Sequence, residues 1–315
     1  PCHRPEGPAP FDLLSYGDVV ARAEQIAHVT QSRYMPPWKP KPGYGRFAGE
    51  RGLTEGQIAA IRRWIAGGEL EGNPDDLPPL PAWTNDWELG QPDLVAPMPA
   101  AYTLPADGAD VFRNFVIPLP VASTRYVRAI EFKPGNARIV PHATMMIDRT
   151  GGARKKEGRD GQPGFSGMSF GEAQDADGHF LGWTQGKTPY AGSDSMAWRL
   201  DPGTDLLLQL HMLPTGKAES IQARIGLFFA DGPPRRSPAM LRLGRKDIDI
   251  PAGESAYRIR DTYRLPVDVE VLTIYPHAHY LGKETKAYAQ LPDGKEQGLI
   301  SVSYTHLTLP TILLV

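Results

Sequence analysis

Two histidines separated by one residue, His277 and His279, form the most chemically informative pattern in the 315-residue sequence. They follow an apolar run from Val269 to Tyr275. Residues two apart on an extended strand point to the same face, with Cα atoms roughly 6.5–7 Å apart. Two imidazoles at that spacing can bind one transition-metal ion. Because surface His-x-His pairs without metal are common, the pair alone is only suggestive, and further histidines are needed to support a metal site.

Two more histidines lie on segments with the alternation of β-strands. In the run from 205 to 212, every second residue from 206 onward is apolar, which puts His211 on the opposite face. The run from 139 to 147 likewise puts His142 opposite its apolar face. Each residue taken alone could be an ordinary strand histidine. Together with the His-x-His pair they predict imidazoles from three strands that are available to bind metal.

The segments LQLHMLPTGK (208–217) and YPHAHYLGK (275–283) resemble the copper-binding strands of the type II, ascorbate-dependent copper monooxygenases, the peptidylglycine α-hydroxylating and dopamine β-monooxygenase-like family. Bacterial relatives in this family carry a fused c-type cytochrome. The resemblance covers about residues 90–300. It implies a mainly β protein with two antiparallel jelly-roll β-sandwiches, each of which holds one copper. The first sandwich would use an adjacent His-His pair and a later His, and the second a His-x-His pair and a Met.

Matched residue by residue, the resemblance assigns four histidines as copper ligands. His142 matches the second member of the His-His pair and His211 the later His, whereas His277 and His279 match the His-x-His pair. Pro141 stands where the first histidine of the pair would be. We therefore expect two copper sites, of which the first is weakened.

Methionines could add a soft thioether ligand for Cu(I) at either site. For Met146 and Met212 we expect core packing instead, because alternation puts Met212 on the apolar face of its strand. The second site lacks its Met, since no methionine follows Met240. Residues 301–315 do not continue the β pattern and resemble translated read-through. We therefore expect the second sandwich, 236–300, to be truncated.

The first residues suggest a haem attachment site. Cys2-His3 resembles the end of a Cys-x-x-Cys-His haem c motif whose first cysteine lies upstream. Met35 lies between two helical segments, where a c-type cytochrome keeps its second axial ligand. The alternative is an ordinary cysteine and a packing methionine. With the resemblance, the pattern predicts a small α-helical cytochrome c-like domain over residues 1–71, with Cys2, His3 and Met35 binding haem.

Helix caps and turn residues predict the remaining organisation. Ser15 caps a helix with apolar positions from 19 to 27, a Thr54-to-Gln57 capping box begins a second helix, and Gly67 ends it. A Pro-rich linker follows over 72–92. The first sandwich is expected over 93–235, with a mobile loop at 151–167. The clearest expected strands are 110–117, 125–132, 139–147, 206–212, 222–229 and 269–275.

Composition limits the partners and the location. A net charge of −2 gives no reason to expect nucleic acid or anionic membrane, and no apolar run approaches the length of a membrane span. One cysteine excludes internal disulfides. Because covalent haem is assembled outside the bacterial cytoplasm, the resemblance implies a periplasmic or secreted protein whose signal peptide lies upstream.

The function implied by the resemblance is a copper-dependent monooxygenase, an oxidoreductase that hydroxylates an activated C–H bond with O₂. Copper at His277 and His279 would act on the substrate, and copper at His142 and His211 would store and deliver an electron. The electrons would come from the fused haem, from ascorbate or from another redox partner. The substrate, a small molecule or a peptide, is not specified, and the truncated chain is expected to be inactive by itself.

Two alternatives belong to other classes. The first is a copper-binding or electron-transfer protein without oxygenase activity, which the gap at Pro141 favours. The second is a structural zinc-binding sandwich, since zinc also accepts imidazole ligands. The metal found in the purified protein would distinguish copper from zinc.

Overall fold

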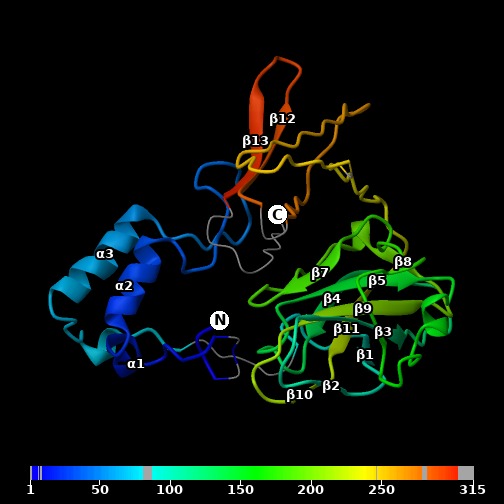
Figure 1. Cartoon of the computed structure of the whole chain (residues 1–315), viewed down its shortest axis with the longest axis horizontal. Coiled ribbons are helices and arrows are strands. Elements are labelled where there is room, and N and C mark those ends of the chain that lie inside the picture. Colours follow the sequence, from blue (N-terminus) through cyan, green and yellow to red (C-terminus); the bar gives the residue numbers. More distant parts are fainter. Residues whose placement is uncertain are drawn as a thin grey trace.

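The computed structural model describes residues 2–5, 7, 9–80, 87–245, 247–278 and 282–303. Antiparallel sheets make up most of its regular structure, so the chain is mainly β (Figure 1). Three helices lie at one side, a sandwich of sheets at the other, and a hairpin above them.

The helices are α1 (Tyr16–Val20), α2 (Ala23–Gln31) and α3 (Glu55–Ala66). Both predicted N-terminal caps are confirmed, because Ser15 and Thr54 each form a capping box. The single helix predicted through residue 27 is instead two helices, since α1 ends at its C-cap Ala21 before α2 begins. A 3-10 turn, η1 (Pro74–Asp76), interrupts the expected linker.

Eleven strands are described before residue 231, together with two short 3-10 turns and a separate C-terminal hairpin. They are β1 (Leu94–Pro97), β2 (Tyr102–Leu104), β3 (Val111–Pro118), β4 (Arg125–Lys133), β5 (His142–Asp148), η2 (Ala153–Lys155), β6 (Phe165–Ser166), β7 (Leu181–Thr184), η3 (Asp194–Met196), β8 (Trp198–Leu200), β9 (Asp205–Met212), β10 (Glu219–Ile221), β11 (Arg224–Ala230), β12 (Glu284–Gln290) and β13 (Glu296–Ser303).

Two sheets enclose the main core. One has the order β6-β3-β9-β5-β7 and the other β1-β11-β4-β8, and a short β10-β2 pair lies beside them. Phe115 and Leu208 from the first sheet share one buried cluster with Val127 and Leu227 from the second. Apolar side chains that alternate along each strand are thus buried between the sheets, which gives a sandwich-like architecture.

The central strand β9 is buried on both faces. Its residues 206, 208, 210 and 212 lie in the main core, as the alternation predicts, and Leu207 on the other face lies in a second cluster with Met146 and Phe165. The segment expected to be a mobile loop covers this second face.

Hydrogen bonds and an ion pair anchor that covering segment. The carboxylate of Asp148 accepts hydrogen bonds from the backbone N–H groups of Thr150, Gly151 and Ala153, at 2.8–3.0 Å. Arg113, buried under the segment, forms a two-bond pair with Asp160 at 2.8 Å. Paired charges and hydrogen-bonded backbone groups thus hold in place a segment for which composition alone predicted an irregular loop.

The C-terminal part contains a hairpin where the second sandwich was expected. Among the described residues between 231 and 283 there is no strand, so the strand predicted at 269–275 is wrong. Alternate valines at the start of this run and just before it, Val267, Val269 and Val271, are 68%, 52% and 47% exposed. The run has the β pattern, but no strand of the described residues pairs with it.

The β12–β13 hairpin packs on the N-terminal part of the chain. Ile300 and Val302 form its buried core, against which Trp38 and Phe47 pack. The expected boundary at residue 300 falls inside β13, where Val302 pairs with Thr285. Residues 304–315 lie outside the described part.

Candidate metal centre

His142 and His211 meet at the ends of two neighbouring strands. They are direct partners in the antiparallel β5–β9 ladder. Side chains of directly opposite residues lie on the same face with Cβ atoms about 5 Å apart. The ring centroids are 4.7 Å apart, and the two Nδ1 atoms are 3.2 Å apart. The structure thus brings together the two histidines that the sequence assigned to the first copper site.

Asp110 fixes the orientation of His211. Its carboxylate lies 2.8 Å from Nε2 of the His211 ring. Phe112, which is paired with His211 in the β3–β9 ladder, stacks on the same imidazole at 4.3 Å with an angle of 6° between the ring planes. Sequence analysis missed both residues, because their proximity depends on the register of β3 against β9 and no local motif records it.

The contact with Asp110 assigns one proton of the pair. Because the carboxylate accepts the Nε2 proton of His211, Nδ1 is the nitrogen of that ring that faces His142. Burial lowers the pKa of His142 to about 4, with smaller contributions from the charges of His211 and His277. His142 is therefore neutral at pH 7.

Two features of this pair suit the binding of one metal ion. An ion bound about 2.0–2.1 Å from each Nδ1, the usual imidazole distance, would subtend roughly 100° at the 3.2 Å separation, close to tetrahedral. A carboxylate bonded to the far nitrogen of a ligand histidine is also the usual second contact of metal-binding imidazoles. The donor set suits copper and also zinc.

The third ligand of this site is not found among the described residues. No group of three or more His, Cys, Asp and Glu side chains in that part of the chain is arranged to hold a metal. Pro141 is buried and its carbonyl accepts a 3.4 Å hydrogen bond from the Gln185 backbone. Met146 and Met212 are buried in the two hydrophobic clusters, in agreement with the packing role expected for them.

The second predicted site is described only in part. His277 is exposed, on a segment whose Tyr275 stacks on Phe180 of the sandwich side at 4.7 Å. The His277 and Tyr275 rings are 6.0 Å apart. Since the charge of His277 contributes to the lowered pKa of His142, the segment lies within electrostatic range of the first pair. His279 lies outside the described residues.

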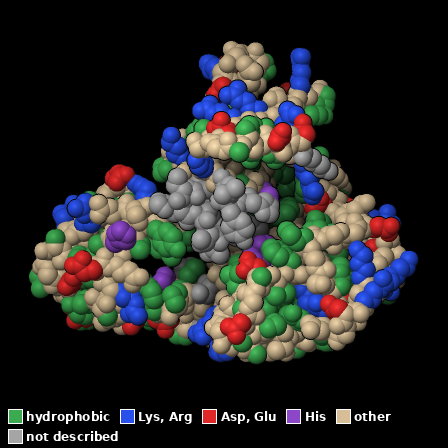
Figure 2. Space-filling view, viewed as in Figure 1, with side chains coloured by type: hydrophobic (Ala, Val, Ile, Leu, Met, Phe, Trp, Pro, Cys, Tyr) green, Lys and Arg blue, Asp and Glu red, His purple; other side chains and the backbone are tan. Residues whose placement is uncertain are grey.

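Histidine side chains reach the surface around the hollow between the sandwich and the segments above it (Figure 2). This hollow is a broad cleft lined by residues from the N-terminal segment, the β7 region and the C-terminal segment, including Cys2, His3, Met35, His142 and His277. All of the described residues assigned to cofactors, except the buried His211, thus line one cleft.

His3 fits axial ligation of a haem. Its Nδ1 lies 3.0 Å from the carbonyl oxygen of Phe11, and its ring lies 4.7 Å from the Phe11 ring. A carbonyl that accepts the Nδ1 proton leaves the Nε2 lone pair for a metal. Met35 is half-buried after α2, and Cys2 is a half-buried thiol. These three residues are compatible with the predicted haem site.

Comparison with known proteins adds no relative: no protein-family model, curated protein or solved structure matches the chain. Within the described residues, no helix is both long enough and apolar enough to cross a membrane.

Proposed function

We propose that this protein is a copper-dependent monooxygenase that hydroxylates an activated C–H bond with O₂, and that His142 and His211 hold one of its coppers. The observation that carries the proposal is the pair of Nδ1 atoms 3.2 Å apart, one of them on a ring fixed by Asp110. Such a pair supplies two ligand nitrogens that are already in position, so the two side chains need little further ordering when a metal binds.

Each residue around the pair has a separate task. Asp110 accepts the Nε2 proton of His211, so that Nδ1 of this ring faces His142. Stacked Phe112 prevents rotation of the His211 ring and keeps water from one of its faces. Burial keeps His142 uncharged, so a metal competes with few protons for its nitrogen. When bound, copper supplies one-electron transfer and O₂ binding.

The second half of the proposal assigns His277 and His279 to the copper that acts on the substrate. The support is the place of His277 on the cleft near His142. We further propose haem bound by Cys2, His3 and Met35, ascorbate or another redox partner as the source of electrons, and a periplasmic or secreted location. The Phe11 carbonyl on His3 supports the haem assignment.

One observation favours electron transfer without oxygenation as a second candidate. Pro141 occupies the position of the third imidazole and offers no side-chain donor. A site with two protein nitrogens still takes up and releases an electron. Copper binding alone therefore does not decide between the two functions.

Copper titration of the metal-free chain, followed by electron paramagnetic resonance, tests the metal assignment. We expect nitrogen hyperfine splitting from imidazoles, and loss of about one copper equivalent in His211→Ala. His28→Ala is the matched control, because His28 is an exposed histidine in the last turn of α2. Unchanged copper content in His211→Ala, or zinc in place of copper in the purified protein, would refute it.

Oxygen consumption distinguishes the two candidate functions. With copper bound and ascorbate or a reduced cytochrome as the electron donor, the oxygenase proposal predicts O₂ uptake by the protein. His277→Ala or His279→Ala should abolish this uptake, whereas His211→Ala should only slow it. An intact protein that holds both coppers and consumes no O₂ is an electron-transfer protein.

A further inference from the structure

Lys187 lies in the turn that follows β7, at the wall of the cleft. Its side chain is half-buried, and its ammonium group donates a hydrogen bond to the carbonyl oxygen of Gly182. The partial removal from water lowers the pKa of Lys187 to about 8. A lysine ammonium withdrawn from water usually has a partner for its charge, since removing an ammonium from water is costly.

No carboxylate among the described residues forms an ion pair with Lys187. The Gly182 carbonyl engages one of the three N–H donors of the ammonium. Lys39, the other lysine of this cleft with a lowered pKa, differs because its ammonium lies 5.4 Å from the ring centroid of Tyr34. Lys283 also lines the cleft and donates to a carbonyl, that of Ser255, but it is exposed. Among the described residues, Lys187 is thus the half-buried cleft lysine with neither a carboxylate nor an aromatic face for its charge.

A second cation lies beside the same turn. Arg51 donates a 3.1 Å hydrogen bond to the Thr188 hydroxyl. A Cβ atom added to Gly186 would lie 3.5 Å from a guanidinium nitrogen of Arg51, so the two side chains flank one short turn. Two cations at the wall of a cleft raise the local positive potential and favour an anion.

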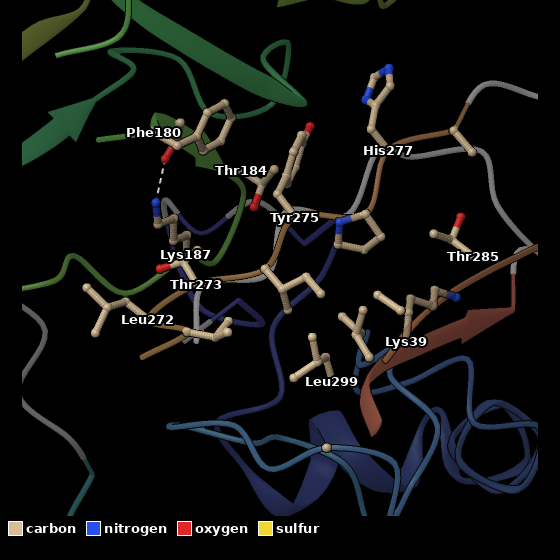
Figure 3. Close-up of a pocket in the computed structure, with 18 of the residues that line it drawn as sticks. Lys39, Phe180, Thr184, Lys187, Leu272, Thr273, Tyr275, His277, Thr285 and Leu299 are labelled. Carbon is tan, nitrogen blue, oxygen red and sulfur yellow. Dashed lines mark hydrogen bonds between the residues drawn. The ribbon is translucent and has the colours of Figure 1, made fainter. Parts of the chain in front are cut away.

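The wall that carries Lys187 has aromatic, aliphatic and threonine side chains. Figure 3 draws Phe180, Thr184 and Lys187 on one wall of the cleft, with Tyr275 beside them. The rings of Phe180 and Tyr275 stack at 4.7 Å. Thr184 pairs with His142 in the β5–β7 ladder, which puts this wall next to the candidate metal centre.

We propose that Lys187 is the anchor of a ligand site for a small aromatic carboxylate in this cleft. Since the Arg51 guanidinium already donates to the Thr188 hydroxyl, the anchor is one ammonium with one carbonyl partner. That matches one carboxylate better than a phosphate, which usually has several cationic partners. The stacked Phe180 and Tyr275 rings supply a surface for an aromatic body. That this ligand is the substrate rests on the proposed function, whereas its binding does not require copper.

Calorimetric titration of the metal-free chain with benzoate, and with its neutral analogue benzamide, tests the site. We expect benzoate to bind at least about tenfold more tightly than benzamide, because only benzoate pairs with the ammonium. Lys187→Met, which keeps the length of the side chain, should remove this preference. Lys155→Met, at an exposed lysine away from the cleft, should retain it. Equal affinities for the two probes, or no benzoate binding at millimolar concentration, would overturn the proposal without any variant.

The same titration in His211→Ala separates this site from the proposed function. We expect benzoate to bind this variant as it binds the unmodified chain, because His211 is not part of the anion site. If benzoate binding depends on Lys187 but the chain does not bind copper, the ligand site is supported and the oxygenase proposal is refuted. Circular dichroism of Lys187→Met checks that the variant is folded. A folded Lys187→Met that still prefers benzoate rules out the proposed anchor.

Discussion

Two segments of this molecule share the same β alternation, but one forms a buried strand and the other forms no strand. In β9 every residue is buried, and the strand pairs with β3 on one side and β5 on the other. The run from 267 to 271 alternates valines with charged residues in the same way, yet its valines are largely exposed and it forms no strand. Alternation therefore specifies which face is apolar, and neighbouring strands decide whether the backbone forms a ladder.

The two candidate metal sites differ in the same sense. His142 and His211 are held by a ladder, an aromatic stack and a carboxylate. His277 is exposed on a segment without regular structure. We infer that the first pair is prearranged in the metal-free chain, while the His-x-His segment gains order when a metal binds it.

The largest expected effect is a difference in the free energy of unfolding between a variant in the sandwich and a variant in the C-terminal segment. Leu208→Ala removes a side chain that is 0% exposed, and we expect the free energy of unfolding to fall by about 2–5 kcal/mol. Leu243→Ala, at a leucine that is 53% exposed, should change it by less than about 0.5 kcal/mol. Urea unfolding measures both. Similar losses in the two variants would mean that residue 243 belongs to a packed core.

The burial of His142 should make the sandwich sensitive to acid. Its pKa falls from 6.5 to about 4 in the metal-free folded state, so the unfolded chain binds more protons between these values. Stability is therefore retained above pH 6.5 and falls as the pH drops to 4, by up to about 3 kcal/mol from this residue. In His142→Gln that part of the loss should disappear, whereas His28→Gln should keep it. If stability depended on pH in the same way in the two variants, the partial burial of His142 would be contradicted.

The carboxylate on His211 should matter for one metal site and not for the other. Asp110→Asn keeps the size of the side chain but removes its charge, and we expect copper at the sandwich pair to bind about 10–100-fold more weakly. Copper at the His277 segment should bind as before, since no contact joins Asp110 to that segment in the described structure. Competition with a copper chelator measures both affinities. Equal weakening at both sites would show that Asp110 acts through the fold as a whole.

The sequence predicted the faces and caps of this protein better than its pairings. Alternation placed His142 and His211 opposite the core, and the Ser15 and Thr54 caps were correct, because these features depend on residues close in sequence. The roles of Asp110 and Phe112 depend on the register between β3 and β9, which no local pattern encodes. Lys187 was missed as well, because no local pattern marks this lysine as half-buried.

The smallest predicted effect tests the coupling between the two regions. The charge of His277 is the last of three causes that lower the pKa of His142, after burial and the charge of His211. In metal-free His277→Ala we therefore expect a slight rise in the pKa of His142, measured from the pH dependence of its ring proton resonances. His28→Ala should leave that titration unchanged. Because charges in water are screened within about 8–10 Å at ordinary salt, the rise should shrink as ionic strength increases. A His142 titration identical with and without His277 would mean that the C-terminal segment does not lie near the sandwich pair in solution, and the two proposed copper sites would then act independently.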